Sequence, residues 1–246
     1  MNNIYNYFIS NKITIIDIYK DLNNIVLSIC DNNNVEGNYN TFDNNCDNSI
    51  KNALCKQANL FWCSKIINND VNANVNANVN ANVNVNICEI GFNAGHSSIL
   101  ILEGQENKSF NFTIFDIGLH LYMKPCFNFI KDKYKNANIE LIEGDSIQTI
   151  PEWITNNKNC IGTYSLIHID GGHSKECIEN DMKNADLLIN NNGIIIIDDT
   201  NYYYIKMCVD YYIKNKNYEE IFLLEIDEKY CNPHRIIQKK MIKFYN

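Results

Sequence analysis

The feature that most constrains this fold is a regular alternation of short apolar runs with longer amphipathic stretches, which begins near residue 87. Such alternation predicts β-strands connected by α-helices, and therefore a mostly parallel sheet with helices on both faces. The run 194–197 consists of isoleucines alone, as expected of a central parallel strand. We predict strands at residues 85–90, 112–116, 139–142, 164–170, 193–198, 220–226 and 235–239, and helices at 97–102, 124–134, 174–189 and 203–214.

The last two predicted strands follow one another without a helix, because only residues 227–234 separate them. This short connection predicts an antiparallel hairpin that closes the sheet. The predicted fold is therefore an α/β, Rossmann-like sheet of seven strands. It is mostly parallel with an antiparallel last strand, has helices on both faces, and carries an N-terminal helical cap.

The N-terminal part of the chain departs from this pattern. Residues 1–66 have apolar positions at helical spacing, and 49–62 look like an amphipathic helix that covers a sheet edge or the mouth of a site. Residues 70–86 alternate asparagine with valine and alanine, which is compatible with a strand, but the near-perfect repeat favours a surface loop. We therefore expect a helical cap at 1–66, a low-complexity linker at 67–84 and the main domain at 85–246.

Composition limits the partners and the location of the protein. The net charge of -8 leaves no extended basic face for nucleic-acid phosphates and favours a small-molecule partner. We find no signal peptide and no apolar run long enough to cross a bilayer, so we expect a cytoplasmic protein without membrane contacts. The 10 cysteines include no CxxC pair, which argues for reduced, mostly buried thiols. The oligomeric state is open, with a homodimer as one alternative.

Ligands of an open parallel sheet bind beyond the carboxyl ends of its strands, so the turn after the first strand is informative. It reads Glu-Ile-Gly-Phe-Asn-Ala-Gly from Glu89 to Gly95. Gly91 and Gly95 allow a tight bend and a close approach of the backbone to a ligand. Asn93 replaces the middle glycine of the GxGxxG dinucleotide pattern. Backbone amides near Ser97, at the start of the next helix, favour an anionic group such as a carboxylate.

Acidic residues follow the next two strands. Asp116 ends the second predicted strand, where a carboxylate can accept hydrogen bonds from both hydroxyls of a ribose. Asp145 lies in the Gly144-Asp145-Ser146 turn after the third strand and can accept a bond from an adenine amino group. Each acid alone also fits an exposed loop position or a helix cap. Acids at successive strand ends nevertheless indicate a nucleoside.

Five segments together resemble class I methyltransferases that use S-adenosylmethionine (SAM), and more narrowly the branch with an Ile-Asp-Gly-x-His segment after the fourth strand. These segments are residues 89–97, Asp116, 144–146, 169–173 and 197–199. The resemblance covers about residues 85 to 240 and leaves the N-terminal region without a matching motif. It implies that the chain is an enzyme that binds SAM.

The resemblance also implies which residues bind the cofactor. They are Glu89, Gly91, Asn93, Gly95, Ser97, Asp116, Asp145, Ser146 and Asp170. Residues of the turn after the first strand would line the methionine end of SAM. Asp116 would hold the ribose, and Asp145 with Ser146 would contact the adenine.

A further group of acids follows the fourth and fifth strands. Asp170 ends the fourth strand, and Asp198 and Asp199 follow the fifth; on neighbouring strands, about 4.8 Å apart, such carboxylates can converge on one cation. Oxygen ligands favour Mg²⁺ over zinc. The resemblance to metal-dependent O-methyltransferases of sugars and natural products implies that these three residues bind Mg²⁺, which lowers the pKa of the acceptor hydroxyl. Alternatively, Asp170 binds substrate directly and Asp199 is a turn residue.

His173 and Asp170 are the candidate catalytic residues. An imidazole near its reference pKa of about 6.5 can take the hydroxyl proton at neutral pH. Alternatively, His173 and Ser174 only begin the next helix, with Ser174 as its N-cap. We expect His96 to pack beside the cofactor turn, and His168, inside a strand, to be structural.

The predicted function is methyl transfer from SAM to a small-molecule acceptor, at a hydroxyl oxygen and with Mg²⁺ assistance. A nicotinamide-dependent oxidoreductase shares the sheet and the acid after the second strand, but it requires the GxGxxG turn and leaves Asp145 unexplained. A non-catalytic SAM- or nucleotide-binding module is favoured if Asp170, Asp198 and Asp199 point away from the pocket. No motif identifies the acceptor.

Overall fold

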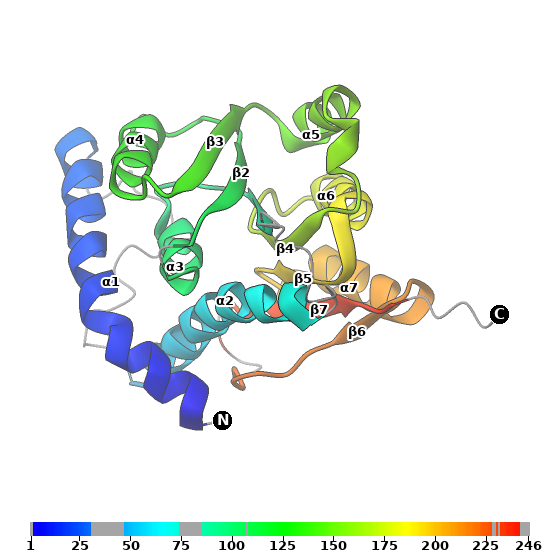
Figure 1. Cartoon of the computed structure of the whole chain (residues 1–246), viewed down its shortest axis with the longest axis horizontal. Coiled ribbons are helices and arrows are strands. Elements are labelled where there is room, and N and C mark those ends of the chain that lie inside the picture. The colour runs from blue at the N-terminus through cyan, green and yellow to red at the C-terminus, as the bar shows by residue number, and fades with distance from the viewer. Residues whose placement is uncertain are drawn as a thin grey trace.

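The computed structural model describes residues 2–30, 47–73, 85–106, 108–227, 230 and 232–241. Within them, a seven-stranded sheet has the order β3-β2-β1-β4-β5-β7-β6 (Figure 1). The strands are β1 (Val85–Ile90), β2 (Phe110–Asp116), β3 (Ala137–Glu143), β4 (Tyr164–Ile169), β5 (Ile189–Ile197), β6 (Tyr218–Glu220) and β7 (Arg235–Lys239). Neighbours among β1 to β5 pair in parallel, whereas β7 is antiparallel to both β5 and β6. The predicted sheet is therefore confirmed.

Helices cover both faces of this sheet. They are α1 (Asn2–Ile29), α2 (Asp47–Ala73), α3 (His96–Gly104), α4 (Met123–Lys133), α5 (Ser146–Asn156), α6 (Lys175–Leu188) and α7 (Tyr203–Asn215), with a short 3₁₀ turn at Lys158–Cys160. One hydrophobic cluster includes α1 to α4, and the other includes α5 to α7. Ile194 and Ile196 of β5 join the first cluster, and Ile195 and Ile197 join the second. The isoleucine run is thus a strand buried on both faces, as predicted.

The sequence misplaced one strand. The predicted strand at 220–226 is instead β6, which pairs with β7 only from Tyr218 to Glu220. The chain then leaves the sheet because α2 satisfies its backbone groups. Leu224 donates its N–H to Asn59 Oδ1 at 2.9 Å, and its carbonyl accepts from Asn59 Nδ2 at 3.0 Å. A side chain that is far away in the sequence therefore decides where β6 ends.

The boundary between cap and linker also differs from the expectation. α2 continues through Ala73, so the first residues of the expected linker at 67–84 are helical. Residues 74–84 lie outside the described part of the chain, and the expected loop there stays a prediction. In the described residues, no helix combines the length and apolar character needed to span a bilayer.

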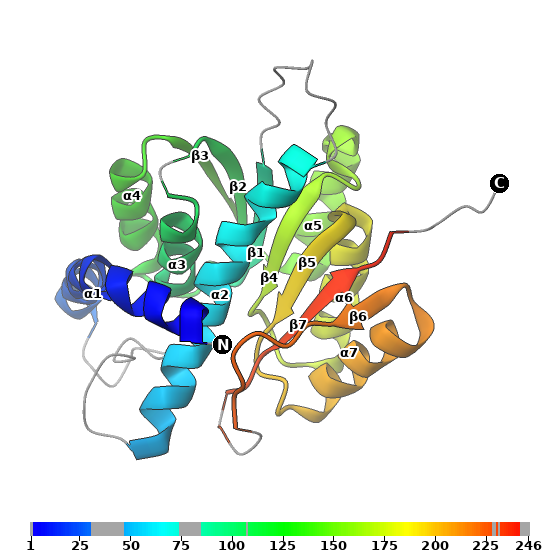
Figure 2. The ribbon, with the colours of Figure 1, turned by 60° about the horizontal axis from the view of Figure 1, so that its bottom comes forward.

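The two N-terminal helices share the core of the main domain. Phe8, Ile15 and Leu22 of α1 are completely buried in the same cluster as α3 and α4. α2 crosses this face of the sheet over β4 and β5 (Figure 2). Its Ser64 hydroxyl donates a hydrogen bond to the Ile101 carbonyl of α3 at 2.6 Å. α2 is thereby fixed where it can form a wall of any site at the strand ends.

Candidate active site

A cavity of about 570 Å³ lies at the carboxyl ends of the parallel strands. It is bounded by the turns after β1, β2, β3, β4 and β5, one side of α2, and the segment before β7. Most of the predicted site residues line it: Gly91, Asn93, Ser97, Asp116, Asp145, Ser146, Asp170, His173, Asp198 and Asp199. Glu89 and Gly95 do not. One cavity thus collects residues from the whole length of the parallel sheet.

The two glycines of the turn after β1 are needed for protein packing. Gly91 has a φ of 94°, and a Cβ there would lie 2.0 Å from the carbonyl oxygen of Asp170. Gly95 has a φ of 85°, and its Cβ would lie 2.5 Å from Ile130 of α4. Gly91 lines the cavity, so the expected close approach of its backbone to a ligand stays a prediction. At Gly95 the close neighbours are side chains of the core.

Glu89 lies beneath the cavity. Its carboxylate is completely buried and accepts hydrogen bonds from the Ser98 hydroxyl and, at 3.0 Å, from His168 Nδ1. Burial alone would lower the pKa of His168, but the hydrogen bond to Glu89 and the charges of Glu89, Asp170 and Asp198 together outweigh burial and raise that pKa above its usual value. Glu89 therefore orients His168 and α3, and the direct contact with methionine expected from the sequence does not fit this geometry.

The acids after β2 and β3 bind backbone amides. Asp116 accepts through Oδ2 from the N–H groups of Phe92 and Asn93, at 2.8 and 2.9 Å, and through Oδ1 from Gly118 at 2.8 Å. It therefore ties the turn after β1 to the turn after β2. Asp145 is the N-cap of α5 and accepts from Ile147 N at 3.0 Å. The helix-cap alternative thus holds for Asp145, which still lines the cavity.

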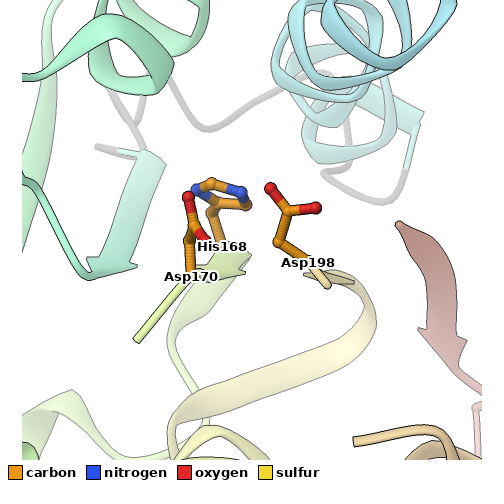
Figure 3. Close-up of side chains that lie close together, drawn as sticks. All are labelled: His168, Asp170 and Asp198. Carbon is orange, nitrogen blue, oxygen red and sulfur yellow. The ribbon is translucent and has the colours of Figure 1, made fainter. Parts of the chain in front are cut away.

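His168, Asp170 and Asp198 form an acidic cluster beside α2 (Figure 3). Their candidate ligand atoms all lie within 4.8 Å of one another. Asp170 opens on the cavity, yet burial and then the charge of Asp198 raise its pKa to about 7. Lys56 Nζ lies 2.6 Å from Asp198 Oδ1. Burial opposes ionisation of Asp198, but Lys56 and the neighbouring histidines together outweigh burial, so the pKa of Asp198 is lowered.

Asp199 does not join this cluster. Its φ of 54° turns the side chain toward His173, and Asp199 Oδ2 lies 2.8 Å from His173 Nε2. His173 also stacks on the ring of Tyr202, with the ring centroids 4.4 Å apart. The following residue, Ser174, caps α6 by accepting from Cys177 N. The helix start therefore holds His173 at the cavity beside a carboxylate, and its role as a general base stays a prediction.

The sequence named the mouth of a site as one of two targets for the helix at 49–62, but it did not identify the residues of α2 that line the cavity. These are Ala53, Lys56, Gln57 and Leu60, and their spacing of three and four residues places them on one side of the helix. Gln57 Oε1 is buried and has no hydrogen-bond partner among the described residues.

Two histidines also line the cavity, although only a structural role was expected for His168 and none for His234. His168 faces the cavity, and its spacing of two residues from Asp170 could have indicated this, since alternate residues of a strand share a side. His234 lies before β7 and receives a hydrogen bond from Asn59 Nδ2 at 3.1 Å. Burial lowers the pKa of His234 to about 3, so it is neutral. Nothing in the sequence pointed to it.

His96 packs beside the cofactor turn. Its Nε2 lies 2.8 Å from Asn23 Oδ1 of α1, and its ring meets Tyr19 edge-on. Burial lowers the pKa of His96 to about 4, so the ring is neutral at physiological pH. A neutral, hydrogen-bonded histidine in this position supports the loop and the first turn of α3.

Comparisons with known proteins agree with this arrangement. Residues 88–200 match the family model described as a methyltransferase domain. No curated protein has a significantly similar sequence. The fold resembles CalS11, described as a TDP-rhamnose 3'-O-methyltransferase in calicheamicin biosynthesis, with a TM-score of 0.56, 12% identity, and coverage of 90% of this chain and 93% of that chain. It also resembles SAH-bound PaMTH1 from Podospora anserina, with a TM-score of 0.54, 12% identity, and coverage of 92% and 88%.

At such identities the solved structures establish the fold, and the family match establishes the kind of domain. The family match also favours methyl transfer over the nicotinamide-dependent alternative. Residues 88–200 therefore match a methyltransferase domain, and the whole chain shares its fold with solved methyltransferases.

Proposed function

We propose that this enzyme transfers the methyl group of SAM to a hydroxyl oxygen of a small polar molecule. The observation that carries the proposal is the pair of His173 and Asp199, which opens on the same cavity as the turn after β1. The name of CalS11 describes O-methylation of a nucleotide sugar by a protein of this fold. A hydroxylated small molecule is the corresponding acceptor class for this chain.

The cofactor side of the cavity extends from the turn after β1 to α5. Gly91, Asn93 and Ser97 would line the methionine end, and Asp145 with Ser146 the adenine. Asp116 would hold the ribose. An ionised carboxylate has about four acceptor sites, and three backbone N–H groups occupy three of those of Asp116. One acceptor site is then left for a ribose hydroxyl.

The acceptor side of the cavity is capped by α2. The amide oxygen of Gln57 is buried there without a donor, which costs roughly 1–3 kcal/mol until a partner supplies one. A rotation of the Gln57 side chain, which lines the cavity, would present this oxygen to a hydroxyl of the acceptor. This supports a polyhydroxylated acceptor, because one hydroxyl can bind Gln57 while another is methylated.

His173 would serve as the general base. In the tautomer in which Nε2–H donates a hydrogen bond to Asp199, Nδ1 carries no proton and can accept the proton of the acceptor hydroxyl. The oxygen then forms a bond to the methyl carbon of SAM. The bond between that carbon and sulfur breaks, and its electron pair stays on sulfur to give a neutral thioether. The protein mainly supplies positioning and the proton acceptor.

The expected magnesium ion fits this arrangement poorly. Of its three predicted ligands, Asp199 is paired with His173 instead, and Asp198 already pairs with the ammonium group of Lys56. Asp170 and Asp198 retain oxygen atoms that suit Mg²⁺, with His168 beside them. Mg²⁺ assistance therefore stays a prediction, and His173 is a candidate proton acceptor that would not depend on it.

Calorimetry with SAM, followed by methyl transfer to a panel of sugars, nucleotide sugars and phenols with radiolabelled SAM, tests the proposal. We expect SAM to bind, binding to weaken in Asp116→Ala, and label to reach a hydroxyl compound. Unchanged SAM affinity in Asp116→Ala would refute the ribose assignment. Binding of NAD without binding of SAM would refute the function itself.

A further inference from the structure

We propose that Lys56 is the resident cation of the acidic cluster and donates a hydrogen bond to the acceptor oxygen, so that methyl transfer needs no divalent metal. The proposal deepens the proposed function and rests on it. It assigns a catalytic residue to α2, outside the segment 88–200 that matches the methyltransferase family.

Position is the first argument. Lys56 and Gln57 lie on the side of α2 that lines the cavity, and Lys56 Nζ lies 2.6 Å from Asp198 Oδ1. The Lys56 side chain is 20% exposed and that of Asp198 is 6% exposed, so water screens this pair poorly. A metal ion that binds Asp198 Oδ1 would therefore have to displace the ammonium group of Lys56.

The orientation of Asp198 is the second argument. Its Oδ1 also accepts a hydrogen bond from the N–H of Asp199 at 2.9 Å. Its own N–H is bound to the Ile169 carbonyl at 2.9 Å. The carboxylate is thus held from two sides with Oδ1 directed at Lys56. The backbone conformation at the end of β5 therefore sets the position of the ion pair between Asp198 and Lys56.

Charge is the third argument. Glu89 and His168 pair with one another, which leaves the carboxylates of Asp170 and Asp198 facing the single ammonium of Lys56. Without Lys56, the carboxylates of Asp170 and Asp198 face one another without an ammonium group, and only when both are ionised do they carry the charge that one divalent cation balances. With Lys56 in place, the charge of Asp198 is already compensated. The cluster is therefore matched to its lysine, and removing the lysine should create affinity for a metal.

The chemistry follows from the donors of an ammonium group. It has three N–H bonds, and Asp198 engages one of them. Because Lys56 lines the cavity, another can reach an acceptor oxygen and stabilise its negative charge as His173 takes the proton. No bond to Lys56 forms or breaks, and its own proton stays in place.

Mn²⁺ binding, measured by electron paramagnetic resonance on the full chain, tests this without knowledge of the acceptor. We expect no saturable Mn²⁺ binding by the wild type or by Lys56→Arg. In Lys56→Met we expect affinity to rise by about tenfold or more, because a repelling charge is lost. Lys65→Met is the matched control, since Lys65 lies on the same helix but pairs with Glu106. Saturable Mn²⁺ binding by the wild type, equal to that of Lys56→Met, would overturn the proposal.

Activity provides the second readout. We expect wild-type turnover to be insensitive to EDTA, and Lys56→Met to lose on the order of 10²-fold in kcat and regain part of it with Mg²⁺. SAM affinity should not change in Lys56→Met, which separates a lost cation from a misfolded variant. If SAM binds but EDTA abolishes turnover, the inference fails while the methyltransferase function stands. If SAM does not bind the wild type, the proposed function fails.

Discussion

The two halves of the cavity satisfy their charged groups in different ways. On the cofactor side, Asp116 and Asp145 bind backbone N–H groups of nearby turns and of a helix start. On the proposed acceptor side, Lys56, Asp198 and His173 bind side chains of other elements or of other turns, and Asp198 also accepts the backbone N–H of Asp199. Backbone partners come with the fold and make a rigid frame. Side-chain partners are exchangeable, so the acceptor half is where specificity and catalysis can change without loss of the fold.

The largest expected effect is that of a substitution in the turn after β1, which belongs to the backbone frame of the cofactor side. Gly91→Ala places a Cβ 2.0 Å from the Asp170 carbonyl at a positive φ, so we expect a loss of about 3 kcal/mol or more in the free energy of unfolding and loss of SAM binding. Urea unfolding and calorimetry measure both. Gly162→Ala is the control, because Gly162 also has a positive φ but no atom within 4 Å. Equal losses in the two variants would show that the clash with Asp170 is unimportant.

The next effect is confined to the acceptor half. His173→Ala should lower kcat by about 10²- to 10⁴-fold, because it removes the proposed base, while SAM affinity stays the same. Asp199→Asn, which weakens only the orientation of the imidazole, should cost less. Steady-state kinetics of both variants distinguishes the roles. A His173→Ala enzyme with an intact kcat would leave His173 as a helix-start residue.

One buried acid outside the cavity lacks such partners. Asp181 of α6 is completely buried near Gly171, and its oxygens have no hydrogen-bond partner among the described residues. Burial raises the pKa of Asp181 to about 6. The folded state therefore binds more protons than the unfolded state above pH ~4, and stability falls as pH rises from ~4 to ~6.

We accordingly expect Asp181→Asn to raise the free energy of unfolding at pH 7 by about 2 kcal/mol, with the difference vanishing near pH 4. Urea unfolding at both pH values measures it. Asp186→Asn on the same helix is the control and should destabilise instead, because Asp186 accepts bonds from Tyr218 and Lys239. A pH-independent gain in Asp181→Asn would rule out a charged, unpaired carboxylate as the cause.

The smallest effect tests the acceptor wall. Gln57→Leu should raise the KM for the acceptor by about 3- to 10-fold, the value of one neutral hydrogen bond, with little change in kcat. SAM affinity should be unaltered, because Gln57 belongs to the acceptor side. A rise in the Kd for SAM without a rise in the KM for the acceptor would contradict the assignment of Gln57 to the acceptor side.

This division also explains what could be predicted from the sequence. The sheet, most strand bounds and the positions of Asp116, Asp145 and Asp170 follow from local periodicity and from turns, which short segments encode. Lys56 could not be placed, because its pairing with Asp198 requires α2 to cross β4 and β5. The contact of Asp199 with His173 could not be predicted either, because it depends on the positive φ of Asp199, and its role as a metal ligand stays a prediction.

The single-sided stripe on α2 has a practical consequence. Ala53, Lys56, Gln57 and Leu60 form one wall of the cavity, yet they belong to one helix and to no strand. A combinatorial library at Ala53, Gln57 and Leu60 would therefore reshape the acceptor wall while the sheet and the cofactor turns keep their sequence. Keeping Lys56 fixed in such a library retains the proposed chemistry. The enzyme thus offers an acceptor preference that can be engineered from a stretch of eight consecutive residues, 53–60.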